Sequence, residues 1–376
     1  MVAPAGRTPQ NGPMAIEGGR GSGAGRKTSR TRDRRSLPIL CAILLAGGGC
    51  VGLEGGEGPF ETRNLHPTQL TAWIPGGRTA KVVEGTEVRG ETAIASLWLL
   101  DGPGVDAIQL DGELIRTNLS LRRGLGPQLD FRANLPVLSF SGGFLDDLIV
   151  AWHRAFGMPQ NLRDRLPRDR ARALAGSSSA LTGAADPAYT LGEGGIHLGD
   201  LGTSLTWFPG AGEGPFHWGL RGGLEFPTGS PSRGFGNGGL DASFGAVAGW
   251  EGRRLSFQVW WDKSFLHQPG AAKRAGIRYP DPWSLGASLQ AGLFPGGVGL
   301  VQVQVEPSLL RGLREAHARP TQASLFVGGR FRVREGLSLE FLVGEDLVQD
   351  VGPDVQFHLG FRLRLGTEGS KRRIGR

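Results

Sequence analysis

Apolar and polar residues alternate strictly along many segments of the chain after about residue 90. In 216–226, for example, Trp218 and Leu220 fall on one face and His217 and Arg221 on the other. A period of two places alternate side chains on opposite faces of a β-strand. The pattern predicts about twelve strands, at 91–100, 107–121, 128–140, 199–208, 216–226, 240–250, 255–262, 283–293, 298–306, 323–334, 337–343 and 355–365.

The links between these strands alternate in length. Tight links rich in glycine and proline are followed by longer loops, and this order continues to the last strand. Outer-membrane barrels have this arrangement, with tight turns in the periplasm and longer loops outside. The tight links are 208–216, 251–253, 295–297 and 335–336, and the longer ones are 227–238, 265–281, 307–319 and 345–353.

Strand length and link order together predict the fold class. Many strands have about ten residues, which suits a tilted strand that crosses a bilayer. An even strand number places both ends of the barrel on the periplasmic side. We therefore expect an all-β protein, a single antiparallel transmembrane β-barrel over 87–366, followed by a basic tail at 367–376.

One long insertion, 142–194, interrupts the order of the strands and is expected to be an extracellular loop. Its first part, 144–156, places Leu145, Leu148 and Ile149 on one face at helical spacing. The rest is polar, charged or rich in glycine and serine. The sequence thus predicts one long helical loop insertion, and it leaves open whether this loop plugs the barrel.

The N-terminal residues 1–50 read as an export signal. A basic stretch precedes a short apolar run at 37–46, and small residues follow, which is the order of a secretory signal. Cys50 lies where a bacterial lipoprotein is lipidated, and the alternatives of lipidation and ordinary cleavage stay open. Residues 51–86 are expected to form a periplasmic N-terminal segment.

Four further segments resemble a bacterial family known as domain of unknown function 3187. They are RNLHP at 63–67, LDGELIR at 110–116, LSFSGGFLDDLIVAWHRAFGMP at 138–159 and GDLGTSLTWF at 199–208. The resemblance implies an outer-membrane-type barrel from a Gram-negative bacterium. It implies no activity, and it transfers no catalytic residue to this chain.

The positive charge of the chain is concentrated at its ends. The formal net charge is +7, and residues 1–36 alone carry eight Arg and Lys against two acids. With the basic tail set aside as well, the body 51–366 is slightly acidic, so we expect no nucleic-acid partner. The 64 glycines suit the turns, loops and curved strands of a barrel.

The polar faces of the predicted strands supply the candidate functional residues. A basic wall on the last strands would favour anionic solutes in a pore, whereas a salt-bridged, filled interior is the alternative. The sequence leaves both open. The residues expected to face the lumen are Arg132, His217, Arg221, Glu225, Arg330, Arg332, Glu340, His358, Arg362 and Arg364.

The loop helix carries the other candidate group, Asp146, Asp147, Trp152 and His153. An Asp and a His two turns apart could act as an acid–base pair or bind a metal, but a solvated helix face is the favoured interpretation because no third ligand is evident. No recognisable metal or phosphate-binding motif occurs. We expect no catalytic site, no cofactor and no metal.

Two functions remain after this reasoning. The first is a narrow channel or uptake protein for small solutes in the outer membrane. The second is a non-transporting structural or surface-binding barrel that uses 142–194, and an outer-membrane enzyme is a remote third. The expected partners are the lipid bilayer and the barrel-assembly machinery, and the expected state is a monomer.

Overall fold

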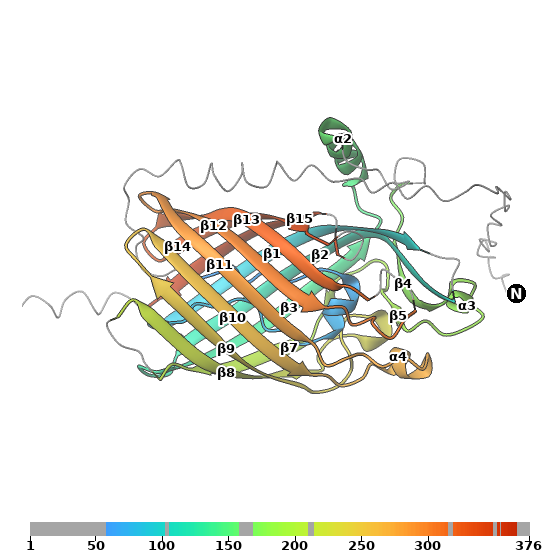
Figure 1. Ribbon diagram of the computed structural model, residues 1–376, viewed down its shortest axis with the longest axis horizontal. Coiled ribbons are helices and arrows are strands. Elements are labelled where there is room, and N and C mark those ends of the chain that lie inside the picture. The colour runs from blue at the N-terminus through green and yellow to red at the C-terminus, as the bar shows by residue number, and fades with distance from the viewer. Residues whose placement is uncertain are drawn as a thin grey trace, which may run out of the picture.

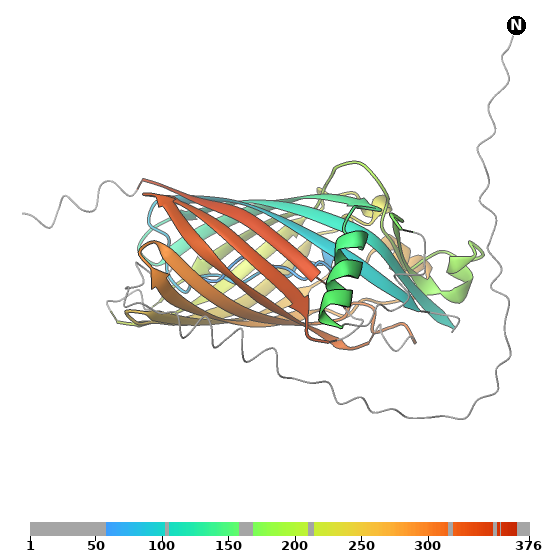
Figure 2. The ribbon, with the colours of Figure 1, turned by 90° about the horizontal axis from the view of Figure 1, so that it is seen from above.

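A computed structural model describes residues 58–101, 105–157, 168–209, 214–314, 319–348, 352–353 and 355–366. Twelve antiparallel strands form a closed barrel, because the first strand pairs with both the second and the last (Figures 1 and 2). The prediction of a twelve-stranded all-β barrel is confirmed. In order around the barrel, the strands are β1 (Thr86–Asp101), β2 (Asp106–Gly124), β3 (Leu129–Ser141), β7 (Leu201–Trp207), β8 (Phe216–Phe226), β9 (Asp241–Glu251), β10 (Leu255–Phe265), β11 (Trp283–Phe294), β12 (Gly297–Pro307), β13 (Thr321–Arg334), β14 (Leu337–Asp346) and β15 (Val355–Leu365).

The alternation in the sequence sorts the side chains between the two faces of this sheet. In β8, Phe216, Trp218 and Leu220 are exposed on the outside, whereas His217 and Arg221 are buried on the inside. The other barrel strands repeat this pattern. The outer face therefore presents an apolar belt, as a closed sheet in a bilayer requires.

The two ends of the barrel differ. Tight turns join the strands at one end, as at Glu335–Gly336, where Gly336 has a φ of +74°. The first and last strands also meet there, with Thr86 opposite Leu365. We call this the tight-turn end and the opposite one the long-loop end. Both ends of the barrel sequence therefore lie on one side.

Short elements decorate the long-loop end. They are the 3-10 turns η1 (Pro67–Thr71) and η2 (Pro231–Arg233), the helices α2 (Asp146–Phe156), α3 (Ser178–Leu181) and α4 (Gly270–Arg274), and the strands β4 (Arg172–Ser177), β5 (Tyr189–Thr190) and β6 (His197–Leu198). None of the helices in the described ranges is long and apolar enough to cross a membrane.

The insertion 142–194 is less helical than expected. Its helix α2 has eleven residues and α3 has four. Its described remainder includes β4, which pairs with Asp106–Asp111 of β2, and β5, which pairs with β4. The prediction of a long helical insertion is not supported, because the run RALAGS alternates small apolar residues that extend the sheet beyond the barrel.

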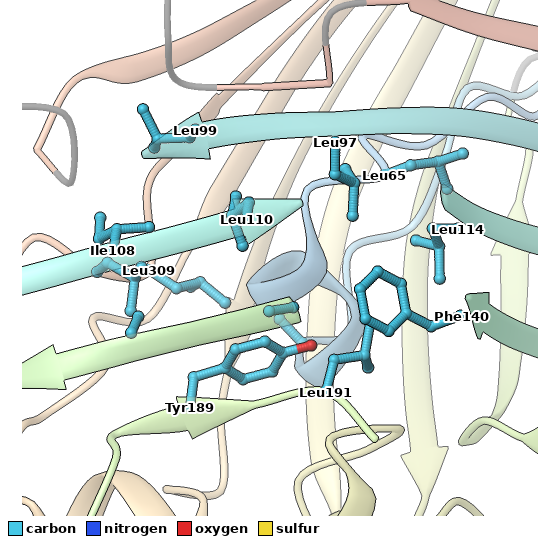
Figure 3. Close-up of a cluster of buried hydrophobic side chains, with 14 of the residues drawn as sticks. Leu65, Leu97, Leu99, Ile108, Leu110, Leu114, Phe140, Tyr189, Leu191 and Leu309 are labelled. Carbon is cyan, nitrogen blue, oxygen red and sulfur yellow. The ribbon is translucent and has the colours of Figure 1, made fainter. Parts of the chain in front are cut away.

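An apolar cap closes the long-loop end (Figure 3). The extended parts of β1 and β2, strands β4 and β5, the α4 loop and residues 309–313 contribute to one buried cluster. Leu65, Ala72 and Ile74 from the N-terminal segment join this cluster. The cap therefore ties the loops to the chain that precedes the first strand. Its labelled members are Leu65, Leu97, Leu99, Ile108, Leu110, Leu114, Phe140, Tyr189, Leu191 and Leu309.

The segment before β1 lies inside the barrel. We expected 51–86 in the periplasm, but residues 58–83 are largely buried within the ring of strands (Figure 2), and 51–57 fall outside the described residues. Their polar side chains form hydrogen bonds with polar side chains on the inner face of the sheet, so both sets of groups have partners when the segment lies in the lumen. We call 58–85 the plug segment. The signal 1–50 with Cys50, and the tail 367–376, also lie outside the described residues.

Candidate functional site

The plug segment enters and leaves the lumen at the tight-turn end and turns round near the cap. Its first arm, 58–66, lies against β12 and β13. The backbone N–H of Phe60 donates to Gln302 Oε1 at 3.1 Å, and Asn64 Nδ2 donates to Gln322 Oε1 at 2.5 Å. Inward-facing glutamines of the wall thus replace water for the backbone and side chains of this arm.

The second arm, 72–85, lies against the opposite wall. Trp73 Nε1 donates to Ser243 Oγ of β9 at 2.6 Å. Arg78 Nη2 donates to Ser204 Oγ of β7 at 2.9 Å. Because β12 and β7 lie on opposite sides of the ring, the two arms together cross the lumen.

The turn between the arms is η1, and His66 caps it. The Thr68 hydroxyl lies 2.9 Å from His66 Nδ1, and the Thr68 N–H donates to the same nitrogen at 3.4 Å. Burial lowers the pKa of His66 to about 4, so the ring is neutral near pH 7. Tyr189 of the cap donates its hydroxyl proton to the Pro67 carbonyl at 2.9 Å. The cap therefore holds the plug segment directly.

Carboxylates of the plug and of β1 and β14 match the arginines of the inner wall. Glu340 Oε1 lies 2.7 Å from Arg330 Nε and 3.3 Å from Arg362 Nη2. Glu87 lies 2.7 Å from Arg89 Nε and 3.2 Å from Arg364 Nε. The basic wall that the sequence indicated is thus paired with acids.

Most of the candidate lumen residues are buried. Arg132 pairs with Glu61 of the plug, Arg221 Nε lies 2.9 Å from Asp262 Oδ1, and His358 Nδ1 lies 2.6 Å from Glu91 Oε1. The exceptions are at the tight-turn end, where Arg332 is exposed and the side chain of Arg364 is one-third exposed. The buried members are Arg132, His217, Arg221, Glu225, Arg330, Glu340, His358 and Arg362.

The loop-helix candidates lie outside the barrel (Figure 1). Asp147 is exposed and pairs with Arg168, while Asp146 accepts a hydrogen bond from the backbone N–H of Asp169 at 3.2 Å. The side chains of Trp152 and His153 fall outside the described residues. Among the described residues, no group of three or more His, Cys, Asp or Glu could hold a metal ion.

Sequence reasoning missed the plug residues Glu61 and Arg78 and the strand acids Glu87 and Asp262. Inward-facing glutamines such as Gln302 could have indicated that a segment fills the lumen, because buried amide groups require hydrogen-bonding partners. The arginines on the inner face required acids for the same reason.

Cavities lie at both ends of the plug segment and beside it. One of about 710 Å³ opens at the tight-turn end beside Lys81, His217 and Trp218. One of about 440 Å³ lies at the long-loop end between Thr71, Tyr189 and Tyr279. A third of about 30 Å³ lies between them, inside the barrel. The plug segment therefore separates two larger spaces.

Several solved structures are similar to this chain. The COG4313 outer membrane channel from Pseudomonas putida F1 has a TM-score of 0.48 and 12% sequence identity, over 76% of this chain and 98% of that one. The NanC porin has a TM-score of 0.41 and 8% identity, over 75% and 100%. The toluene transporter TbuX from Ralstonia pickettii has a TM-score of 0.36 and 9% identity, over 76% and 90%.

The sequence comparisons give one match. No curated protein sequence matches the chain. The model of the family described as a protein of unknown function (DUF3187) matches residues 39–183, and this match confirms the resemblance that the motifs at 63–67, 110–116 and 138–159 indicate.

Proposed function

We propose that the chain is an outer-membrane channel for small solutes, closed by its plug segment. The observation that supports this most directly is the kind of contact that holds the plug. Polar and ionic groups, such as Asn64 with Gln322 and Arg78 with Ser204, join it to the wall. Water can replace such contacts at little net cost, so a polar plug can leave a polar lumen.

The outer face supports the location in a membrane. An apolar belt of this kind would promote aggregation of a barrel in water. In a bilayer, the same belt would contact lipid. Every strand of the ring has two hydrogen-bonded neighbours, so the backbone is satisfied without solvent. The long-loop end would face outward, as in other barrels with this loop order.

The two end cavities would be the entry and exit of the path. Their sizes of about 440 and 710 Å³ fall in the usual range for small-molecule sites. Arg330 and Arg362 form ion pairs with Glu340, so their charge is partly neutralised. This wall therefore gives less support to anion selectivity. We therefore extend the proposal to small solutes without a charge preference set by this wall.

Planar-bilayer recording tests the channel. The wild-type protein should be closed most of the time, with brief openings. The double variant Glu61→Gln, Arg78→Gln weakens the plug contacts to Arg132 and Asp130 and should raise the open probability severalfold. Arg168→Gln, at an exposed pair outside the barrel, should behave as wild type. A double variant that folds and never conducts would contradict the channel.

One observation favours the alternative of a surface-binding barrel. Phe144 and Leu148, on and beside α2, are 67% and 54% exposed outside the barrel. An amphipathic helix with exposed large apolar groups can dock on a membrane or a protein. If this is the main role, Phe144→Ser with Leu148→Ser should abolish binding to the membrane or protein partner, and the folded wild-type barrel should give no single-channel steps.

A further inference from the structure

The small cavity inside the barrel is lined by an unusual number of arginines. Arg63 and Arg78 reach it from the two arms of the plug, and Arg116 and Arg132 from strands β2 and β3. Glu61 is the one carboxylate among the described residues that line it. Four guanidiniums thus surround a space of about 30 Å³, deep in the lumen.

The two carboxylates that form ion pairs with these arginines are also bound to other arginines. Glu61 pairs with Arg132, but its other oxygen lies 3.4 Å from Arg89 Nη1, outside the cavity lining. Asp130 lies 3.5 Å from Arg78 Nη1 and also pairs with Arg122. Each of these two acids is therefore shared between two arginines, so these ion pairs alone do not neutralise the four guanidiniums.

Two of the four arginines contact neutral groups only, within the part of the chain that the structure describes. Arg116 Nη2 donates to Asn118 Oδ1 at 3.2 Å, and Arg63 donates to the backbone carbonyls of Gln69 and Ala72. Carboxylates act on these two arginines only at longer range, Glu91 on Arg116 and Glu306 and Glu225 on Arg63. A buried charge without a directly bound counter-charge is costly. A ligand of opposite charge in the cavity would remove that cost.

Arginine N–H groups without a hydrogen-bond partner also indicate that the cavity suits an anion. The Nε atoms of Arg63, Arg78 and Arg132 are buried and have no hydrogen-bond partner among the described residues. All three residues line the cavity. Three free N–H groups and four positive charges are the requirements of an anion site.

We propose that this cavity binds one small monovalent anion of the size of chloride. The space open to the centre of a water-sized species is only about 30 Å³, which suits one small anion rather than a larger solute. Because both plug arms and the barrel wall line the site, the anion links the plug to the wall. Its effect on plug docking rests on the proposed channel function, whereas its binding does not.

Bromide can locate the anion directly. Crystals of the protein grown or soaked in bromide should show an anomalous peak between Arg63, Arg78, Arg116 and Arg132. The absence of a peak there in well-ordered crystals would overturn the proposal. This result does not depend on conductance, so it separates the anion site from the channel.

Thermal unfolding in detergent gives a second measurement. Replacement of gluconate by chloride at constant ionic strength should raise the transition temperature by a few degrees, with saturation, since a ligand that binds only the folded state stabilises it. Arg116→Gln should abolish this increase. Arg330→Gln, a buried arginine away from the cavity, should lower the transition in both salts and keep the increase. Equal transitions of the wild type in chloride and gluconate would contradict the proposal.

Discussion

At the scale of single residues, close packing between the plug and the wall decides how firmly the lumen is filled. Trp73 packs against Gly202 of β7, where a Cβ would overlap the indole ring. The same indole donates its N–H to Ser243 Oγ at 2.6 Å. A glycine on the inner face of a strand thus makes room for the largest side chain of the second arm.

Gly202→Val should therefore displace Trp73 and loosen the plug. We expect faster proteolytic cleavage of the plug segment and a severalfold higher open probability, because the packing of the Trp73 indole and its hydrogen bond to Ser243 are lost together. Limited proteolysis and bilayer recording measure the two effects. The matched control is Gly222→Val on β8, where no atom lies within 4 Å of the new Cβ. Equal behaviour of the two variants would show that Trp73 does not anchor the plug.

His66 makes the docking of the plug sensitive to pH. Its pKa is about 4 when docked and about 6.5 when free in water. The undocked state therefore binds more protons at His66 between these values, so the contribution of His66 to docking is fully present above pH 6.5 and decreases as the pH falls toward 4. The slope is on the order of 1 kcal/mol per pH unit.

Open probability measured between pH 7 and pH 4.5 tests this dependence. It should rise as the pH falls in the wild type. His66→Gln keeps an acceptor for Thr68 but does not titrate, so its response to pH should be flatter. An identical pH response in both proteins would exclude His66 as the responsible group.

At the scale of elements, the sequence predicted the strands and missed what they enclose. Period-two alternation is a local signal, and it placed most of the strands because each presents an apolar outer face. The plug segment lacks such a signal, since both of its sides contact polar walls in the lumen. Residues such as Asn64 and Gln69 therefore read as a solvated segment, although 58–83 are enclosed by strands far away in the sequence.

The insertion illustrates the same limit. The spacing of Leu145, Leu148 and Ile149 predicted α2, and the helix is present. The strands β4 and β5 form only because β2 extends beyond the barrel and offers an edge. Tertiary pairing of this kind cannot be read from six small residues alone.

Strands β1, β13, β14 and β15 share one ionic network, and Glu340 on β14 is its junction. It faces both Arg330 and Arg362 at hydrogen-bonding distance. Glu340→Gln should lower the free energy of unfolding by roughly 3–5 kcal/mol, because it leaves buried guanidiniums without this counter-charge. Thermal loss of the heat-modifiable band on a gel measures it. Glu335→Gln, in an exposed turn, should change little, and equal stability of the two variants would contradict the network.

At the scale of the whole molecule, the chain encloses part of itself. The closed ring satisfies its backbone, the outer belt suits lipid, and the plug segment supplies acids and amides to the inner wall. The cap then fixes the turn of the plug at the long-loop end through Tyr189 and Leu65. In the proposed channel, the contacts that must break for conduction lie at the interface between the plug segment and the lumen wall.

Single-channel recording of a protein without the plug tests this account most directly. Removal of 51–83 should leave a barrel that still migrates with heat-modifiable mobility. This barrel should show long-lived conductance steps under conditions in which the full chain opens only briefly. A folded, plug-free barrel that remains as silent as the full chain would contradict a channel closed by 58–85.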